Sequence, residues 1–319
     1  MVQIRRDLYC VGEMLIDFTP GAEPGTYVRN AGGAPANVAI AAAKNGLRTG
    51  MCCSVGEDDF GCFLLHTLRM YGVEVLRPQM CREAFTTLAF VSLTASGERS
   101  FSFARKPGAD TLLQPGDISA DEIQASCIVH AGSCSLSAEP SAAATALAVQ
   151  TAHRLHRMVS FDVNYRETMW AGRPDLCAAA VRKLLPCVDL LKISREELGI
   201  FGTGVHVETL MEEYGIALAV ETLDADGAAW YFQGCRHVVP GFPAVCVDST
   251  GAGDAFWGAF LSALRLSGVE ETTDLQEDVI QNAVLWGNAA GSICVTGHGG
   301  IPSLPDAAQI VQFLQNRQT

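Results

Sequence analysis

A glycine-rich turn followed directly by an acid is the clearest chemical signal, in the stretch VDSTGAGDAFWGAFLSAL (residues 247–264). Gly251, Ala252 and Gly253 are predicted to open an apolar helix, with their backbone amides aimed at one anion. Asp254 then places a carboxylate in the first turn, where the helix dipole is expected to lower its pKa. An ionised acid beside a bound phosphate can accept a proton from an attacking hydroxyl, so the pattern favours phosphoryl transfer with Asp254 as base. A tight packing turn or a helix cap is the alternative without chemistry.

Two other phosphate-binding patterns do not fit this turn. A Walker A loop requires the dipeptide Gly-Lys, which does not occur in the sequence. A dinucleotide fingerprint requires G-x-G-x-x-G, whereas the glycine that follows Gly253 is Gly258, two positions too late. If a nucleotide binds, neither of these loops holds it.

A second polar group lies near the amino end, around NAGGAPANVAIAAAKNG (residues 30–46). Gly32 and Gly33 allow a ligand to approach the backbone closely, and Asn37 starts an alanine-rich helix. Asp17 is expected at the carboxyl end of the first strand, on the side where open α/β sheets bind ligands. A carboxylate and an amide suit the hydroxyls of a neutral sugar better than they suit an anion. A helix-start Asn that satisfies only local backbone is the alternative for Asn37.

Composition limits the class of protein. The chain has 319 residues, 49% of them apolar and 18% charged, with a formal net charge of −13. That charge argues against a nucleic-acid partner, and no apolar run is long enough to span a membrane. The 12 cysteines form no C-x-x-C pair and lie mostly in apolar runs, so we expect free thiols. Without a signal peptide at the amino end, these thiols favour a cytoplasmic location.

Strand and helix patterns alternate along the chain. Strands are expected at 8–17, 49–56, 126–132, 158–163, 188–194 and 216–223, and helices at 36–46, 60–71, 140–156, 175–185, 206–214, 252–267 and 277–296. This alternation predicts an α/β fold with a mainly parallel central sheet flanked by helices. Residues 85–110 instead indicate an antiparallel hairpin, with which 18–30 could pair. We therefore expect one domain over residues 1–319, with a small β-sheet lid built from about 18–30 and 85–106.

The sequence resembles the PfkB, or ribokinase-like, family of carbohydrate kinases at both polar groups, in GGAPANVA and DSTGAGDAFWGAFL. Landmarks between and after them, such as FDVNYR and LLKISREEL, extend the resemblance over nearly the whole chain. It implies a kinase that uses ATP and Mg²⁺, with Asp254 as the base and the amides of 251–253 as the anion hole. It also implies a β lid that often serves as a homodimer interface.

The resemblance assigns residues to the nucleotide and to metal ions. Lys192, Ser194 and Glu197 match a K-x-[NS]-x-x-E element, in which the Glu organises hydrated Mg²⁺. Thr222 and Gly227 match a nucleotide turn whose middle glycine is replaced here by Asp224. Asn288 is expected beside the adenine. The residues at positions that hold a monovalent cation, such as K⁺, in some members are Asp248, Thr250, Cys294, Gly299 and Ser303.

The sugar half is most similar to fructokinases. That similarity implies a sugar phosphorylated on its primary alcohol, gripped by Asp17, Gly32, Gly33 and Asn37. Further residues expected at the sugar are two aromatic residues and two arginines: Phe101, Phe103, Arg105 and Arg166. A 2-keto-3-deoxygluconate kinase is the alternative, in which the two arginines would pair with the substrate carboxylate. A non-catalytic sugar- or nucleotide-binding protein is the alternative outside the kinases, suggested by the acid at 224.

Overall fold

The computed structural model describes residues 4–21, 23, 25–93 and 99–317. Short strands build a central sheet, called sheet A, and most of them are buried because they are apolar runs that helices cover on both sides. Its strand order is β13-β12-β11-β10-β9-β8-β1-β4-β5. From β11 to β5 all neighbouring strands are parallel, and β12 and β13 add an antiparallel hairpin at one edge. The predicted α/β class is therefore confirmed.

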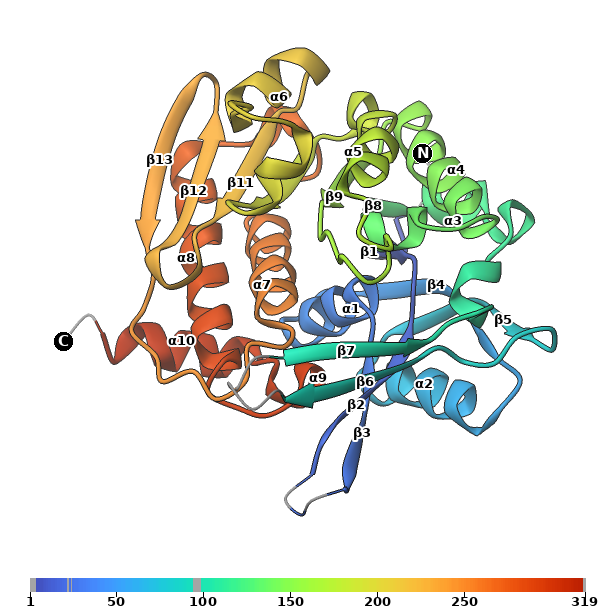
Figure 1. Cartoon of the computed structure of the whole chain (residues 1–319). Helices are drawn as coiled ribbons and strands as arrows, with labels where there is room; N and C mark the ends of the chain where they lie inside the picture. Colours follow the sequence, from blue (N-terminus) through green and yellow to red (C-terminus); the bar gives the residue numbers. More distant parts are fainter. Residues whose placement is uncertain (1–3, 22, 24, 94–98, 318–319) are drawn as a thin grey trace.

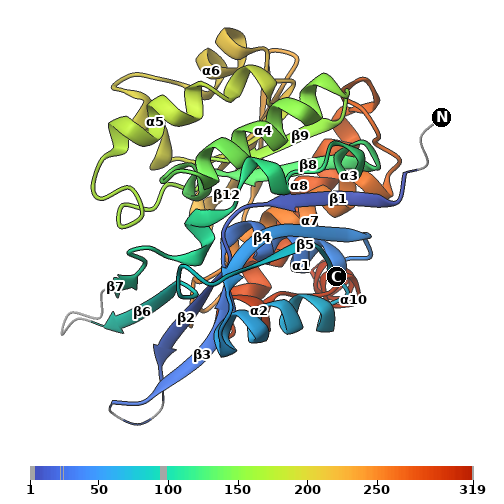
Figure 2. The same ribbon diagram turned by 90° about the vertical axis from the view of Figure 1, so that its right-hand side faces the viewer.

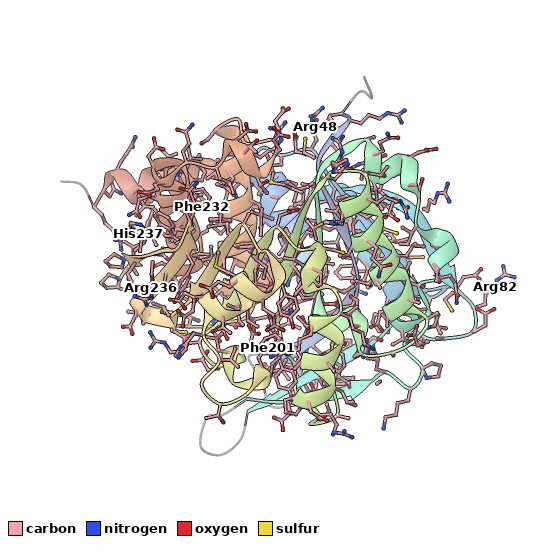
Figure 3. The ribbon with its side chains drawn as sticks, turned by 90° about the horizontal axis from the view of Figure 1, so that it is seen from above. Arg48, Arg82, Phe201, Phe232, Arg236 and His237 are labelled. Atoms are coloured by element: carbon pink, nitrogen blue, oxygen red, sulfur yellow. The ribbon has the colours of Figure 1, made fainter. Side chains whose placement is uncertain are left out.

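The strands of sheet A, in that order, are β13 (Cys235–Pro240), β12 (Gly227–Phe232), β11 (Leu218–Thr222), β10 (Leu190–Ser194), β9 (Met158–Asp162), β8 (Ser126–Gly132), β1 (Arg6–Val11), β4 (Thr49–Gly56) and β5 (Glu74–Cys81). Viewed from above, Arg236 and His237 on β13 lie on one side of the molecule (Figure 3). Arg82, which follows β5, projects from the opposite side. These side chains mark the two edges of the sheet.

Helices cover both faces of sheet A, as Figures 1 and 2 show. One face carries α1 (Ala34–Lys44), α2 (Asp59–Met70), α7 (Ala252–Leu266), α8 (Glu277–Cys294) and α10 (Ala307–Gln315). The other carries α3 (Ala120–Gln124), α4 (Ser141–Arg154), α5 (Pro174–Arg182) and α6 (Val207–Tyr214). A short helix, α9 (Gly300–Ser303), follows α8. In the described ranges, none of the helices combines the length and the apolar character that a membrane span requires.

A second, smaller sheet, called sheet B, projects from one side of the molecule (Figure 2). Its strand order is β3 (Tyr27–Gly32), β2 (Leu15–Pro20), β6 (Leu88–Leu93) and β7 (Arg99–Ala104). The hairpin expected in 85–110 is the antiparallel pair β6–β7, and the early segment joins it through β2. The role of sheet B as a lid remains a prediction.

The structure corrects one predicted strand and adds three that were not predicted. The run 8–17 is two strands, because the chain turns at Gly12, where φ is 147°, and leaves sheet A for sheet B. β5, β12 and β13 were not predicted: β5 and β13 are partly exposed strands that include charged residues, whereas the apolar run of β12 is buried like the other core strands and was overlooked. The glycine turn follows an irregular segment and not a strand, and Val245 in that segment is 82% exposed.

Helices α1 and α7 pack with their backbones unusually close. A Cβ placed on Gly258 of α7 would lie 2.4 Å from Ala41 Cβ and 3.0 Å from Val38 O of α1. Real Cβ atoms do not approach other atoms at the shorter distance, so any larger residue at 258 must push the two helices apart. The small residues on both helices therefore set how the two helix starts meet.

We expect Gly258→Ala to lower the free energy of unfolding by about 1–3 kcal/mol, because overpacking moves one helix against the other. Urea denaturation measures the change. Gly116→Ala is the matched control, since a Cβ there would meet nothing within 4 Å. Equal stabilities of the two variants would contradict the close packing.

Candidate active site

The starts of α1 and α7 meet at a buried hydrogen bond. Asn37 in the first turn of α1 donates from Nδ2 to Asp254 Oδ2 over 2.8 Å, although the two residues are 217 positions apart. Their exposed fractions are 5% and 7%. The other amide oxygen, Asn37 Oδ1, is buried and has no partner among the described residues. Asn37 therefore touches the predicted base and keeps an acceptor for a ligand hydroxyl.

The expectation that the helix dipole would lower the pKa of Asp254 was wrong. Burial raises this pKa, and the bond from Asn37 and the charge of Lys192 lower it only in part. The cost of ionising a carboxyl group away from water exceeds the stabilisation from the helix start. Asp254 is consequently a stronger base than an exposed aspartate.

Asp17 lies in sheet B and not at the end of a core strand, which corrects its predicted location. It is paired with Asn30 of β3, and its Oδ2 lies so close to Gly32 that a Cβ there would be 2.1 Å away. Burial, and then the charge of Asp254, raise the pKa of Asp17 to about 7, against the opposing charge of Arg166. Asp17, Asp254 and Arg166 therefore lie close enough for their charges to act on one another.

The glycine turn opens α7 as predicted, with Gly251 at the N-cap. The amide of Ala252 turns back to Ser249 O at 3.2 Å. Because the first amides of a helix have no acceptor within it, Gly251 and Gly253 remain the candidates for binding an anion. A Cβ on Gly253 would lie 3.3 Å from Lys192 Nζ, so an ammonium group lies against the turn.

Lys192 forms a buried ion pair with Asp162, a residue that the sequence prediction did not single out. Its Nζ donates to Asp162 Oδ2 over 2.7 Å, and the two side chains are 7% and 2% exposed. Burial would lower the pKa of Lys192, but the carboxylates of Asp162 and Glu197 outweigh it and raise the pKa. The ammonium therefore stays charged beside the turn. Asp162 ends β9, so the strand-end argument first applied to Asp17 could have found it.

A buried polar chain holds α7 on sheet A. Trp257, one turn after Asp254, donates from Nε1 to Ser160 Oγ of β9 over 2.8 Å. Ser160 Oγ also lies 3.0 Å from His130 Nδ1 on β8. Burial lowers the pKa of His130 to about 4, so its ring is neutral and can accept the serine hydroxyl proton. These bonds fix the helix face next to the predicted base.

Glu197 is held by backbone amides at the ends of β9 and β10. Its Oε1 accepts from Tyr165 N and its Oε2 from Ser194 N, each at 2.8 Å, and Glu197 N donates back to Ser194 Oγ at 3.2 Å. Burial, and then the charge of Asp162, raise the pKa of Glu197. Next to it is a cavity of about 490 Å³ lined by Tyr165, Arg166, Pro174, Ser194, Glu196, Glu197, Gly199 and Ile200. Two predicted nucleotide or metal residues thus border one cavity with Arg166.

The replaced glycine at 224 is accommodated in the backbone. Asp224 has a φ of 51°, in the left-handed region that favours glycine. Burial, and then Glu196, raise the pKa of Asp224. Thr222 lies directly beside Ser194 at the carboxyl ends of the paired strands β11 and β10. Gly227 admits no side chain, because a Cβ would lie 2.2 Å from Val239 O.

Asn288 is buried on α8, and its amide nitrogen is used by the protein. It donates to Val239 O at 3.0 Å and to Pro240 O at 3.1 Å. This side chain therefore fastens α8 to the end of β13. The predicted contact of Asn288 with the adenine of the nucleotide remains a prediction.

The residues expected at a monovalent cation gather where the glycine turn meets α9. Asp248 accepts from Thr250 N at 2.7 Å and from Gly299 N at 3.0 Å. Cys294 Sγ lies 3.7 Å from Thr250 O, and Ser303 Oγ donates to His298 O at 3.1 Å. The carboxylate of Asp248 thus ties the turn to the loop before α9.

Sheet B presents Phe103 in line with Ala89 and Asp17, on one face of its strands. The backbone of Phe101 belongs to β7, but its side chain lies outside the described part of the structure. Arg105 is engaged with protein: its guanidinium pairs with Asp110 at 2.7 Å and donates to Ser137 Oγ at 3.0 Å. Asp110, which the prediction overlooked, is fully buried and neutralises it.

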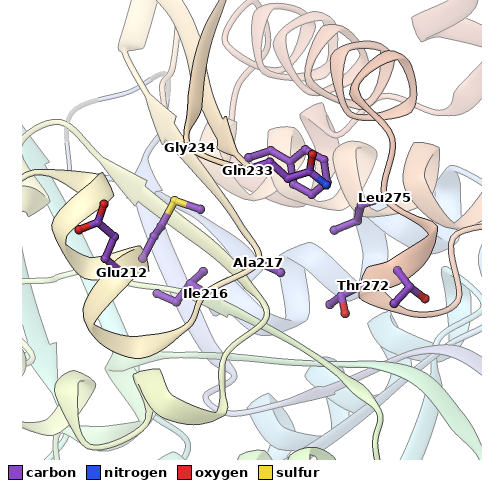
Figure 4. Close-up of a pocket in the computed structure, with 10 residues that line it drawn as sticks. Glu212, Ile216, Ala217, Gln233, Gly234, Thr272 and Leu275 are labelled. Atoms are coloured by element: carbon purple, nitrogen blue, oxygen red, sulfur yellow. The ribbon is translucent and has the colours of Figure 1, made fainter.

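A further cavity of about 480 Å³ lies at the opposite, amino ends of the parallel strands (Figure 4). Its walls come from the end of α6, the start of β11, the β12–β13 turn and the segment before α8. Glu212 is its one ionisable lining residue. None of the predicted site residues lines this cavity.

The fold and the site together indicate an enzyme class: a buried carboxylate beside a glycine-rich helix start, in an α/β sheet, suits phosphoryl transfer to an alcohol. A family model described as pfkB family carbohydrate kinase matches residues 5–307. The chain is 36% identical to fructokinase-1 of Oryza sativa subsp. japonica, with 96% of each protein covered. The chain therefore belongs to the pfkB family of carbohydrate kinases, and it is an ATP-dependent sugar kinase.

Solved structures agree with this assignment. The crystal structure of a fructokinase from Xylella fastidiosa with bound ATP matches with a TM-score of 0.90 and 30% identity, over 98% of this chain and 99% of that one. A fructokinase double mutant from Vibrio cholerae O395, with bound fructose, ADP and potassium ion, matches with a TM-score of 0.87 and 31% identity. That match covers 98% of this chain and all of the other. The predicted ribokinase-like fold is confirmed.

We expect Asn37→Ala to move the acid limb of the kcat–pH profile to higher pH. The bond from Asn37 lowers the pKa of Asp254, so its loss raises that pKa, and more of the base is protonated at any given pH. The profile of kcat at saturating sugar and ATP measures the shift. An acid limb at the wild-type position would show that Asn37 does not act on the base.

Proposed function

We propose that this enzyme transfers the γ-phosphoryl group of ATP to a primary hydroxyl of fructose. The observation that carries this choice is the state of Arg105, whose charge is already paired with buried Asp110. A keto-acid substrate would need that charge for its carboxylate, whereas a neutral sugar needs hydroxyl partners such as Asp17 and Asn37 Oδ1. The fructokinases among the relatives support the same substrate.

In the proposed reaction, Asp254 accepts the proton of the attacking hydroxyl. The sugar oxygen then bonds to the γ-phosphorus while the bond from that phosphorus to the β–γ bridging oxygen breaks, and ADP leaves. The amides of Gly251 and Gly253 and the ammonium of Lys192 stabilise the negative charge on the transferring group. Lys192 is held by its bond to Asp162 and the turn belongs to the start of α7, so these groups need little reorganisation during transfer.

We place ATP along the carboxyl ends of β10 and β11. The cavity beside Ser194 and Glu197 and the turn from Thr222 to Gly227 support this location. Burial and the neighbouring Glu196 raise the pKa of Asp224, and we propose that the resulting loss of negative charge lets the acid be tolerated near the phosphates. Asn288, through its bonds to the end of β13, would hold the protein wall beside the adenine of ATP.

Mg²⁺ fits this site as a hydrated ion. Among the described residues, no group of three or more His, Cys, Asp or Glu side chains could hold a metal by itself. Mg²⁺ usually keeps several waters and binds one or two carboxylates plus substrate phosphates, which suits Glu197 and the unpartnered Asp162 Oδ1. When bound, the ion would neutralise charge on the phosphates. The Asp248–Thr250–Gly299 junction, with Cys294 and Ser303, is our proposed site for K⁺.

Purified enzyme with ATP and Mg²⁺ should release ADP in response to fructose, and more slowly with ribose, adenosine or 2-keto-3-deoxygluconate. Asp254→Asn should lower kcat by a factor of about 10²–10⁴, the range for loss of a general base, and leave the fold intact. A coupled ADP assay with and without K⁺ measures kcat, and a circular dichroism melt checks the fold. Preference for the keto-acid would move the assignment to the alternative kinase, and full activity of Asp254→Asn would remove it as base.

We further propose a homodimer formed through sheet B. Tyr27 and Val28 on its edge strand β3 are 48% and 52% exposed, an apolar pair suited to meeting a second copy. Val28→Lys should shift the sedimentation coefficient from dimer to monomer, because it would bury a charge at the contact. Met70→Lys, at a 69% exposed position on α2, should leave the dimer intact. A monomeric wild type would reject the proposal.

We also propose a cytoplasmic location. All 12 cysteines are free thiols, and seven of them are buried. Such thiols persist in a reducing compartment.

A further inference from the structure

Glu13 is a buried carboxylate at the point where the chain leaves sheet A for sheet B. It lies between the end of β1 at Val11 and the start of β2 at Leu15, and its exposed fraction is 2%. Nothing in the proposed phosphoryl transfer uses it. Lysine or arginine does not pair with it directly in the described residues, so its contacts are with backbone and hydroxyl groups.

Those contacts join three separate segments. Oε1 accepts from the amide of Ala34, the first residue of α1, at 3.2 Å. Oε2 accepts from the hydroxyl of Ser135 at 2.6 Å, and the amide of Glu13 donates to the same Ser135 oxygen at 3.1 Å. Ser135 belongs to the short helix Ser133–Leu136 that follows β8. One side chain thus connects the root of sheet B, the start of α1 and the end of β8.

The bond to Ala34 supplies a cap that α1 lacks. The N-cap residue of α1 is Gly33, which has no side chain to satisfy the exposed amides, and Pro35 offers no amide. A carboxylate at a helix start is also favoured by the helix dipole. Helix α1 is therefore capped by a residue from a different element, and this cap fixes the helix start to that element.

The backbone around Glu13 is tightly packed, so the segments that it joins cannot shift independently. A Cβ on Gly33, whose φ is 112°, would lie 2.4 Å from Glu13 O. A Cβ on Gly12, whose φ is 147°, would lie 2.4 Å from Ser135 Oγ and 2.8 Å from Pro35 Cγ. The segments joined by the carboxylate are therefore also packed in direct contact, so a shift of one moves the others.

The chain that leaves sheet B after β7 also passes close to Glu13. After β7, Arg105 pairs with Asp110, and Asp110 accepts the hydroxyl of Thr87 at the start of β6. Burial raises the pKa of Glu13 to about 7, with Ser135 lowering it, Asp110 raising it and Arg105 lowering it. Glu13 therefore lies where the outgoing and returning connections of sheet B reach the core.

We propose that Glu13 is a positioning residue for the sugar site: its carboxylate fixes the start of α1 against the root of sheet B. Asp17 is four residues further along β2, and Asn37 is in the first turn of α1. The distance between these two groups is set through Glu13. This inference rests on the proposed sugar site and extends it, because Glu13 itself touches no substrate.

The proposal predicts a selective kinetic effect. We expect Glu13→Ala to raise the KM for the best sugar substrate of the wild type by about tenfold or more, since misplacement of a binding group by a fraction of an ångström is costly. The KM for ATP should change by less than about twofold, because the nucleotide residues lie on β10 and β11. Glu13→Gln keeps an oxygen for Ala34 and should restore most of the sugar affinity. Ser135→Ala should give a smaller change in the same direction.

The control is Asp189→Ala, at another carboxylate that accepts one backbone amide, Val159 N, at 2.8 Å. It should lower the melting temperature and leave both KM values unchanged. Steady-state kinetics over sugar and ATP, with melting curves for all variants, make the comparison. Glu13→Gln and Ser135→Ala keep the test decisive if Glu13→Ala does not fold. Unchanged sugar KM in those variants, or equal rises in both KM values, would overturn the inference. Activity with a sugar other than fructose would reject only the proposed substrate.

Discussion

The hydrogen bond from Asn37 to Asp254 is the contact on which the site depends. It joins the first turns of α1 and α7, which the sequence separates by 217 positions. A bond to a charged group contributes about 1.5–3 kcal/mol, but its geometry matters more here than its strength. Gly258 lets the two helices approach closely enough for it to form. The same helix starts carry the glycine turn and the unpartnered Asn37 oxygen, so one junction positions both halves of the proposed site.

Charge balance explains why this junction can act as a base. The carboxyl groups of Asp17, Asp162 and Asp254 lie near two cations, Lys192 and Arg166, in a site largely removed from water. Burial and mutual repulsion raise the pKa of Asp17 and of Asp254. Proton uptake by Asp254 relieves that repulsion, so the environment favours transfer of a proton from a sugar hydroxyl. The paired ammonium of Lys192 stays charged for the phosphoryl group.

The sequence predicted the elements whose signals are local. The glycine turn before Asp254 and the helix start at Asn37 follow from residue types over a few positions. Contacts between distant segments could not be predicted from it: the Asn37–Asp254 bond depends on helix packing, and the Lys192–Asp162 ion pair depends on how β9 and β10 lie side by side. The raised pKa of Asp254 was missed because burial, a tertiary property, exceeds the helix dipole.

The most direct test of this account is the pKa of Asp254 itself. Infrared difference spectra of wild type against Asp254→Asn, recorded as a function of pH, isolate the stretch of its protonated carboxyl group. The account predicts a titration midpoint clearly above the ordinary aspartate value of about 3.9. A carboxyl group that ionises at or below that value would contradict it, since the buried junction would then not create a stronger base.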